Sequence, residues 1–149
     1  MREIPGPDES STVAEIRRGV TRLAHRLRAE RPADALSANK VSVLGHLYRH
    51  GPSTPGEVAA AEYQHPQSLT RVFAELGAAG LITRTRSDRD GRESVLTLTE
   101  SGRDALTGDM AQRDAWLDEV LAGLTPTEVE LLRIASALME RIAEPERDT

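Results

Sequence analysis

Residues Leu81 to Leu98 carry the strongest signal for the fold: Leu-Ile-Thr-Arg-Thr-Arg-Ser-Asp-Arg-Asp-Gly-Arg-Glu-Ser-Val-Leu-Thr-Leu. The two ends of this stretch, 81–86 and 93–98, are rich in Leu, Ile, Val and Thr, and each has the alternating side-chain pattern of a β-strand. The polar middle contains Asp-Gly, so the whole stretch predicts a β-hairpin. Gly91 can adopt the positive φ of a tight turn, which puts Arg89 and Arg92 at the tip. Arginines at the tip of a two-stranded ribbon suit a nucleic-acid groove or backbone. A merely solvated turn is the alternative, because Asp, Gly and Arg are ordinary turn residues.

Three helices are predicted between Ser37 and this hairpin. Their boundaries are marked by capping and stop residues: Ser37 and Gly51 for the first, Thr54 and Glu57 for the short second one, and Pro66 and Gly80 for the third. The order is helix, helix, short turn, helix and hairpin. This order predicts a winged helix-turn-helix.

The third of these helices has the side chains that a recognition helix needs. Gln67, Ser68, Thr70 and Arg71 lie opposite its apolar stripe, near its N-terminal end. Glutamine pairs with adenine edges, arginine pairs with guanine O6 and N7, and serine or threonine bonds phosphate or base. The same residue types also occur on any solvent face. Their position between a capped helix and an arginine-tipped hairpin favours DNA binding.

Helices on both sides of this region predict a dimer. Thr12 and Glu15 have capping-box spacing and precede apolar residues at helical spacing. Thr99 is expected to cap a long helix whose apolar stripe is interrupted by Gly108, and Thr125 with Glu128 opens a last helix with a broad apolar face. One small winged domain cannot cover all of this surface, so a partner chain is expected to do so. The alternative is that these helices pack on one another within one chain.

Composition narrows the function. The chain has 149 residues, no cysteine and a net charge of −5. Residues 64–92 hold five arginines and three acids, whereas residues 93–149 hold five arginines and 13 acids, so a locally basic face is compatible with the acidic total. We expect a cytoplasmic protein without a membrane span, and the lack of nucleotide-loop, hydrolase or metalloprotease motifs predicts no enzyme. His46 and His50 have zinc-compatible spacing but lack further ligands nearby, so no metal or cofactor is predicted.

From Leu36 to Leu106 the sequence resembles the MarR family of bacterial transcriptional regulators. The resemblance rests on five matching pieces: Gly51-Pro52-Ser53-Thr54-Pro55-Gly56-Glu57-Val58-Ala59, Gln67-Ser68-Leu69-Thr70-Arg71, the run from Leu76 to Gly80-Leu81-Ile82, Asp88-Arg89-Asp90-Gly91-Arg92 and Leu98-Thr99-Glu100-Ser101-Gly102. The chain departs from the family at His65-Pro66, where a serine or a basic residue is common. The resemblance implies a homodimer that binds a pseudo-palindromic operator, with one recognition helix in each major groove and the wing tips in the flanking minor grooves.

By this resemblance, Gln67, Ser68 and Arg71 would face bases, Thr70 a base or phosphate, and Arg89 the minor groove. Arg92 would contact phosphate or brace the wing through Asp88 or Asp90. The full set of expected DNA-binding residues is Gln67, Ser68, Thr70, Arg71, Arg86, Ser87, Arg89 and Arg92, with Asp88 and Asp90 bracing the wing.

The predicted fold is mainly α with a small β-hairpin wing. It divides into a flexible N-terminus (1–11), a winged helix-turn-helix domain (36–106) and a helical dimerisation region (12–35 and 107–149). The predicted function is that of a DNA-binding repressor that a small aromatic ligand releases from DNA. Trp116, His25 and Arg22 are candidates for lining the ligand pocket, and the alternative for Trp116 is a place in the dimer core. The alternative is a winged-helix module that binds a partner protein instead of DNA.

Overall fold

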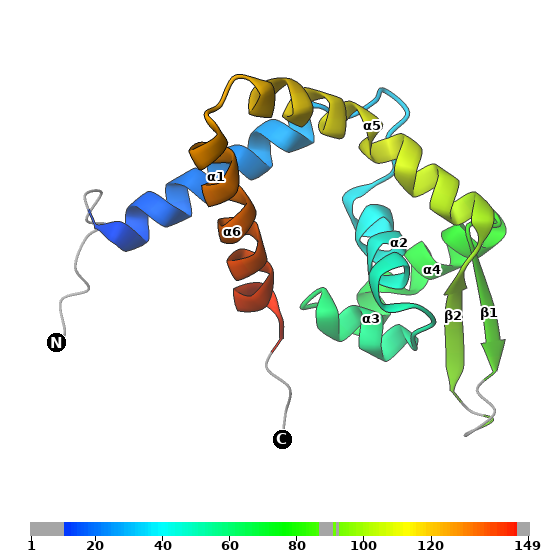
Figure 1. The fold of residues 1–149 in the computed structure, drawn as a ribbon. Helices are drawn as coiled ribbons and strands as arrows, with labels where there is room; N and C mark the ends of the chain where they lie inside the picture. The colour runs from blue at the N-terminus through cyan, green and yellow to red at the C-terminus, as the bar shows by residue number, and fades with distance from the viewer. Residues whose placement is uncertain (1–10, 87–90, 92, 146–149) are drawn as a thin grey trace, which may run out of the picture.

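A computed structural model describes residues 11–86, 91 and 93–145 (Figure 1). Within these residues the chain forms six helices and one two-stranded antiparallel sheet, which confirms the predicted fold class. The elements are α1 (Thr12–Ala29), α2 (Ala38–His50), α3 (Pro55–Ala61), α4 (Pro66–Ala78), β1 (Ile82–Arg86), β2 (Ser94–Leu98), α5 (Glu100–Ala122) and α6 (Pro126–Ala143). No helix in the described part of the chain is both long and apolar enough to span a membrane.

The hydrophobic core lies in the winged helix-turn-helix. Apolar side chains from α2, α3, α4, both strands and the start of α5 form one buried cluster: Val43, Leu44, Leu47, Val58, Ala59, Leu69, Phe73, Leu76, Ile82, Leu96 and Leu106. Ser53 forms an isolated antiparallel bridge with Leu96, so the loop after α2 adds a short third segment beside the wing. The core therefore fixes α4 and the hairpin relative to each other.

Most helix starts were predicted correctly. The side chains of Ser37, Thr54, Thr99 and Thr125 cap their helices, and the boxes at Thr54 and Thr125 are complete. The prediction for α1 was wrong by one residue, because the Ser11 hydroxyl accepts the Ala14 N–H. That shift moves Glu15 one position beyond the place where a capping-box glutamate must be.

A close junction sets the direction of the hairpin. Gly80 adopts φ 73° after α4, and the Leu81 N–H donates to the Leu76 carbonyl, which together make a Schellman stop. Thr99 then ties the start of α5 to this turn through its backbone N–H to the Leu81 carbonyl (3.1 Å) and its hydroxyl to the Gly80 carbonyl (2.7 Å). Gly102 packs so closely here that any Cβ would overlap the Leu81 carbonyl oxygen.

The remaining helices form a second lobe. α5 spans from the winged domain to α1 and passes Gly108 without a break. In Figure 1, α6 crosses α1 and descends from it, so the chain forms an arch. The predicted interruption at Gly108 therefore does not break the helix. α6 has no buried residue. Large apolar side chains stay exposed on α1 and α6: Val13, Ile16, Val20, Leu23, Leu131, Leu132, Ile134, Leu138, Met139 and Ile142.

Polar contacts between described residues join the lobes at both ends of the arch. The buried Asp109 carboxylate on α5 accepts the Leu36 N–H at 2.9 Å and pairs with Arg113. At the other end of the arch, the Tyr63 hydroxyl donates to the Ala143 carbonyl at 2.7 Å. Tyr63 lies in the turn between α3 and α4, where it adopts a positive φ of 53°. Its hydrogen bond therefore brings the C-terminal end of α6 into direct contact with the helix-turn-helix.

Candidate nucleic-acid interface

The N-terminal half of α4 separates polar and apolar side chains cleanly. Leu69, Phe73 and Leu76 are buried in the core, while Gln67, Ser68, Thr70 and Arg71 are all exposed. The four predicted base-reading residues therefore lie on one accessible helix face. A recognition helix needs this arrangement to enter a major groove.

The start of α4 has little side-chain capping. His65 occupies the N-cap without a side-chain hydrogen bond, and Pro66 takes the first helical position. The Ser68 N–H donates to the His65 carbonyl at 3.0 Å, and the Thr70 hydroxyl donates to the Pro66 carbonyl at 3.3 Å. The departure from the family pattern at His65-Pro66 thus coincides with an absent side-chain cap in this part of the structure.

Arg71 belongs to a three-residue ionic group. Its Nε donates to Glu75 Oε1 at 2.8 Å, one helical turn later on α4. The other oxygen of Glu75, Oε2, lies 3.1 Å from Lys40 Nζ on α2. Hydrogen bonds from Lys40 first and Arg71 second lower the pKa of Glu75 below its ordinary value. The sequence analysis missed Lys40 and Glu75. The i,i+4 spacing of Arg71 and Glu75 could have predicted their ion pair. No sequence pattern indicates the contact between Lys40 on α2 and Glu75 on α4.

The wing adds positive charge beside α4. The hairpin projects from the body of the winged domain (Figure 1). Arg86 is exposed at the end of β1, opposite Ser94, and Arg84 lies two residues earlier on the same face and is also exposed. Arg84 was counted in the charge balance but was not predicted as a contact. The predicted residues Ser87, Asp88, Arg89, Asp90 and Arg92 lie outside the described residues.

His46 has a structural role. It is only 7% exposed, and its Nε2 lies 3.2 Å from the Ser53 hydroxyl, which donates to the Gly51 carbonyl at 2.9 Å. Burial lowers the pKa of His46, and the nearby positive charges of His50 and Arg49 lower it further. Among the residues described here, no three His, Cys, Asp or Glu side chains are grouped as metal ligands. His46 therefore ties α2 to the loop that bridges to β2.

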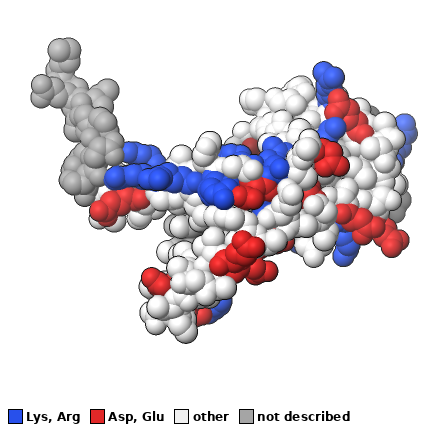
Figure 2. All heavy atoms as spheres, turned by 90° about the horizontal axis from the view of Figure 1, so that it is seen from above, with Lys and Arg blue, Asp and Glu red and all other residues white. Residues whose placement is uncertain are grey.

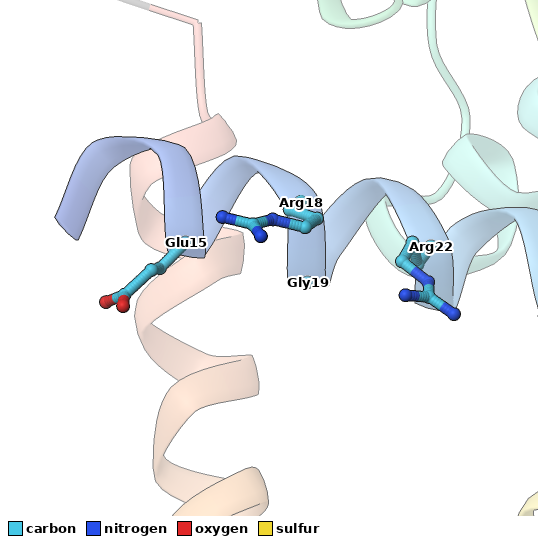
Figure 3. Close-up of a pocket in the computed structure, with 4 residues that line it drawn as sticks. All are labelled: Glu15, Arg18, Gly19 and Arg22. Atoms are coloured by element: carbon cyan, nitrogen blue, oxygen red, sulfur yellow. The ribbon is translucent and has the colours of Figure 1, made fainter. Parts of the chain in front are cut away.

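Arginines also gather far from the recognition surface, along α1. Figure 2 shows a band of basic side chains on this helix. A groove of about 400 Å³ is lined by Glu15, Arg18, Gly19 and Arg22; in Figure 3, Arg18 extends toward Glu15, and Arg22 points away from both. A neighbouring groove of about 380 Å³ is lined by Thr21, Arg22, His25, Arg26 and Arg28. Both grooves are lined by α1 alone.

The predicted trio of Arg22, His25 and Trp116 is only partly brought together. Arg22 and His25 line the same groove, but Trp116 on α5 does not. Its half-buried ring is instead covered by the Arg26 guanidinium, whose Cζ lies 4.7 Å from the ring centroid. This cation–π contact holds α1 against α5.

Comparisons with known proteins agree with this geometry. Residues 36–93 match the model of the MarR family. The chain is 34% identical over 131 residues to the HTH-type transcriptional regulator MT0903.1 of Mycobacterium tuberculosis, which covers 88% of this chain and 92% of that protein.

Solved structures show the same fold. A MarR family protein from Bacillus stearothermophilus is 22% identical and superimposes with a TM-score of 0.75 over 93% of this chain and all of its own. A protein from Pseudomonas aeruginosa PA01 described as a transcriptional regulator is 35% identical, with a TM-score of 0.72 over 95% of this chain and 100% of its own. These relatives are regulators rather than enzymes. The chain therefore belongs to the MarR family and is a transcriptional regulator with a winged helix-turn-helix DNA-binding fold.

Proposed function

We propose that the protein is a homodimeric repressor that binds a pseudo-palindromic operator in the cytoplasm. The observation that supports this most is the exposure of Gln67, Ser68, Thr70 and Arg71 on one face of α4, beside a basic hairpin. Repression is favoured by a relative, the Transcriptional repressor MprA of Escherichia coli, which is 32% identical over 95 residues, 63% of this chain and 54% of that protein.

Each exposed side chain has a proposed role in this complex. Gln67, Ser68 and Arg71 contact base edges in the major groove, and Thr70 contacts a base or a phosphate. Arg86 contacts the backbone beside the wing. Beyond the described residues, Ser87 joins these contacts, Arg89 enters the minor groove, and Arg92 contacts phosphate or is braced by Asp88 or Asp90.

The dimerisation region is proposed to comprise residues 12–35 and 107–149. An exposed apolar face on both α1 and α6, with no buried residue on α6, supports a second chain as its cover. Packing within one chain would instead have buried part of α6. In a two-fold dimer the two copies of α4 would reach successive major grooves about 34 Å apart.

Release by a small aromatic acid is proposed as the form of regulation. Arg22 and His25 line one of the grooves on α1. Arg22 offers a positive partner to the carboxylate of such an acid, and His25 offers an aromatic partner to its ring. BpsR of Bordetella bronchiseptica, whose DNA binding is regulated by 6-hydroxynicotinic acid, and PcaV of Streptomyces coelicolor, solved with its natural ligand, share the fold at 24% and 22% identity. A ligand needs only to favour a wrong spacing of the two α4 helices to release DNA.

The test begins with a duplex that the wild-type protein selects from a random DNA pool. We expect affinity for this duplex to fall steeply with salt. Arg71→Ala should cost about 1–3 kcal/mol on the selected duplex and relax its sequence preference. Arg86→Ala should weaken binding to all sequences and reduce the salt slope by about 1. Arg133→Ala, which removes an exposed arginine from α6, is the control.

No enrichment of any duplex, and no retardation of the gene's own upstream DNA at low salt, would refute the DNA-binding proposal. That outcome would favour the alternative in which the wing and α4 bind a partner protein.

A further inference from the structure

Glu75 joins two cations with its two carboxylate oxygens. Oε1 accepts from Arg71 Nε at 2.8 Å, and Oε2 lies 3.1 Å from Lys40 Nζ. The Arg71 side chain remains 90% exposed despite this contact, whereas Lys40 is 28% and Glu75 41% exposed. The ion pair with Arg71 therefore holds the arginine without covering it.

The geometry of the Arg71–Glu75 contact leaves the terminal nitrogens of Arg71 available for DNA. Only Nε of Arg71 bonds to Glu75, and neither terminal nitrogen has a hydrogen-bond partner among the described residues. The two terminal nitrogens form the edge that reads O6 and N7 of guanine. A long arginine side chain also loses rotamer freedom when it binds, and a partner that restrains it beforehand reduces that loss.

Lys40 connects the Arg71–Glu75 pair on α4 to a second helix. It lies on α2, so its contact fixes the Glu75 carboxylate relative to a second helix. Without Lys40, Glu75 could follow Arg71 through its own rotamers. With Lys40, the position of the carboxylate is set by the packing of α2 against α4.

We propose that Glu75 is a positioning residue for base readout, which holds the Arg71 guanidinium toward the major groove while Lys40 fixes the carboxylate. This role rests on the proposed function, because it requires Arg71 to contact a base. Glu75 also places a negative charge near DNA. Its removal should therefore raise affinity for all DNA while lowering discrimination.

The preference ratio separates these two effects. It is the dissociation constant for a scrambled duplex divided by that for the duplex selected by the wild-type protein. Glu75→Gln keeps the side-chain shape and removes the charge. Glu62→Gln is the matched control, because it removes one charge from the winged domain and Glu62 makes no side-chain hydrogen bond or ion pair with the described residues.

We expect Glu75→Gln to lower the preference ratio about two- to fivefold, the range that an exposed ion pair supports. Lys40→Met should lower it in the same direction, and Glu62→Gln should leave it unchanged. In an Arg71→Ala background, Glu75→Gln should have no further effect on the ratio. In the free protein, the Arg71 Nε–Hε NMR signal should be sharp in the wild type and broadened in Glu75→Gln.

Three outcomes would overturn this role. If Arg71→Ala lowers the ratio but Glu75→Gln does not, positioning by Glu75 is wrong while the proposed function stands. If Glu75→Gln lowers the ratio equally with and without Arg71, Glu75 acts through another group. If Arg71→Ala leaves the ratio unchanged, the proposed base contact fails, and the role of Glu75 fails with it.

Discussion

The exposed face of α6 provides a quantitative test of the dimer. Ile134 is 53% exposed and Leu138 43% exposed, so together they leave about one whole side chain of apolar surface for a partner to cover. Burying a side chain of this kind stabilises by about 1.5–3 kcal/mol. Each substitution occurs twice in a two-fold dimer, once in each chain. Replacing both residues by serine should therefore reduce the free energy of dimerisation by about 3–6 kcal/mol. The dimer dissociation constant should therefore rise at least about 100-fold.

Sedimentation equilibrium over a range of protein concentrations measures this change. Glu140→Ser, on the polar face of the same helix, should keep the wild-type constant. Since α6 contributes nothing to the buried core, circular dichroism should show that the double variant keeps the folded winged domain. A wild-type chain that sediments as a monomer, or a double variant that dimerises like the wild type, would contradict a dimer formed through α6.

Two further predictions concern the winged domain. Gly102→Ala should lower the free energy of unfolding by about 1–3 kcal/mol, because the new Cβ would overlap the Leu81 carbonyl. Gly108→Ala on the same helix has open space around its Cβ and should be neutral or stabilising. Thermal melts that rank the two variants otherwise would contradict the close junction. Burial lowers the pKa of folded His46 below the ordinary value of about 6.5, so the unfolded chain binds more protons between these two values, and stability should fall as pH drops through that window. His46→Gln should reduce this acid loss and the exposed His50→Gln should keep most of it; parallel pH curves for wild type and His46→Gln would count against the assignment.

Local signals predicted the elements well. Ser37, and the Thr54 and Glu57 box, act within one turn of the chain, so their spacing alone was enough to place two helix starts. The start of α1 was misplaced because Ser11 and Thr12 are adjacent hydroxyl residues, and only the path of the chain decides which one caps. The amphipathic pattern of α4 was equally local, so the exposure of the predicted recognition face followed from it.

Contacts between distant elements could not be predicted. The Lys40–Glu75 pair depends on how α2 packs on α4, and the Tyr63–Ala143 hydrogen bond joins residues 80 positions apart. Gly102 was part of the motif that carried the family resemblance. The physical reason for this glycine is the close approach of the Leu81 backbone, which depends on how α5 packs against the end of α4.

The proposed function requires above all that two chains present α4 to one duplex. Hydroxyl-radical footprinting of the wild-type protein on its selected duplex measures this directly. We predict two related protected segments on one face of the DNA, with centres about one helical turn or 34 Å apart, and two protein chains per duplex. A single protected segment bound by one chain would contradict it.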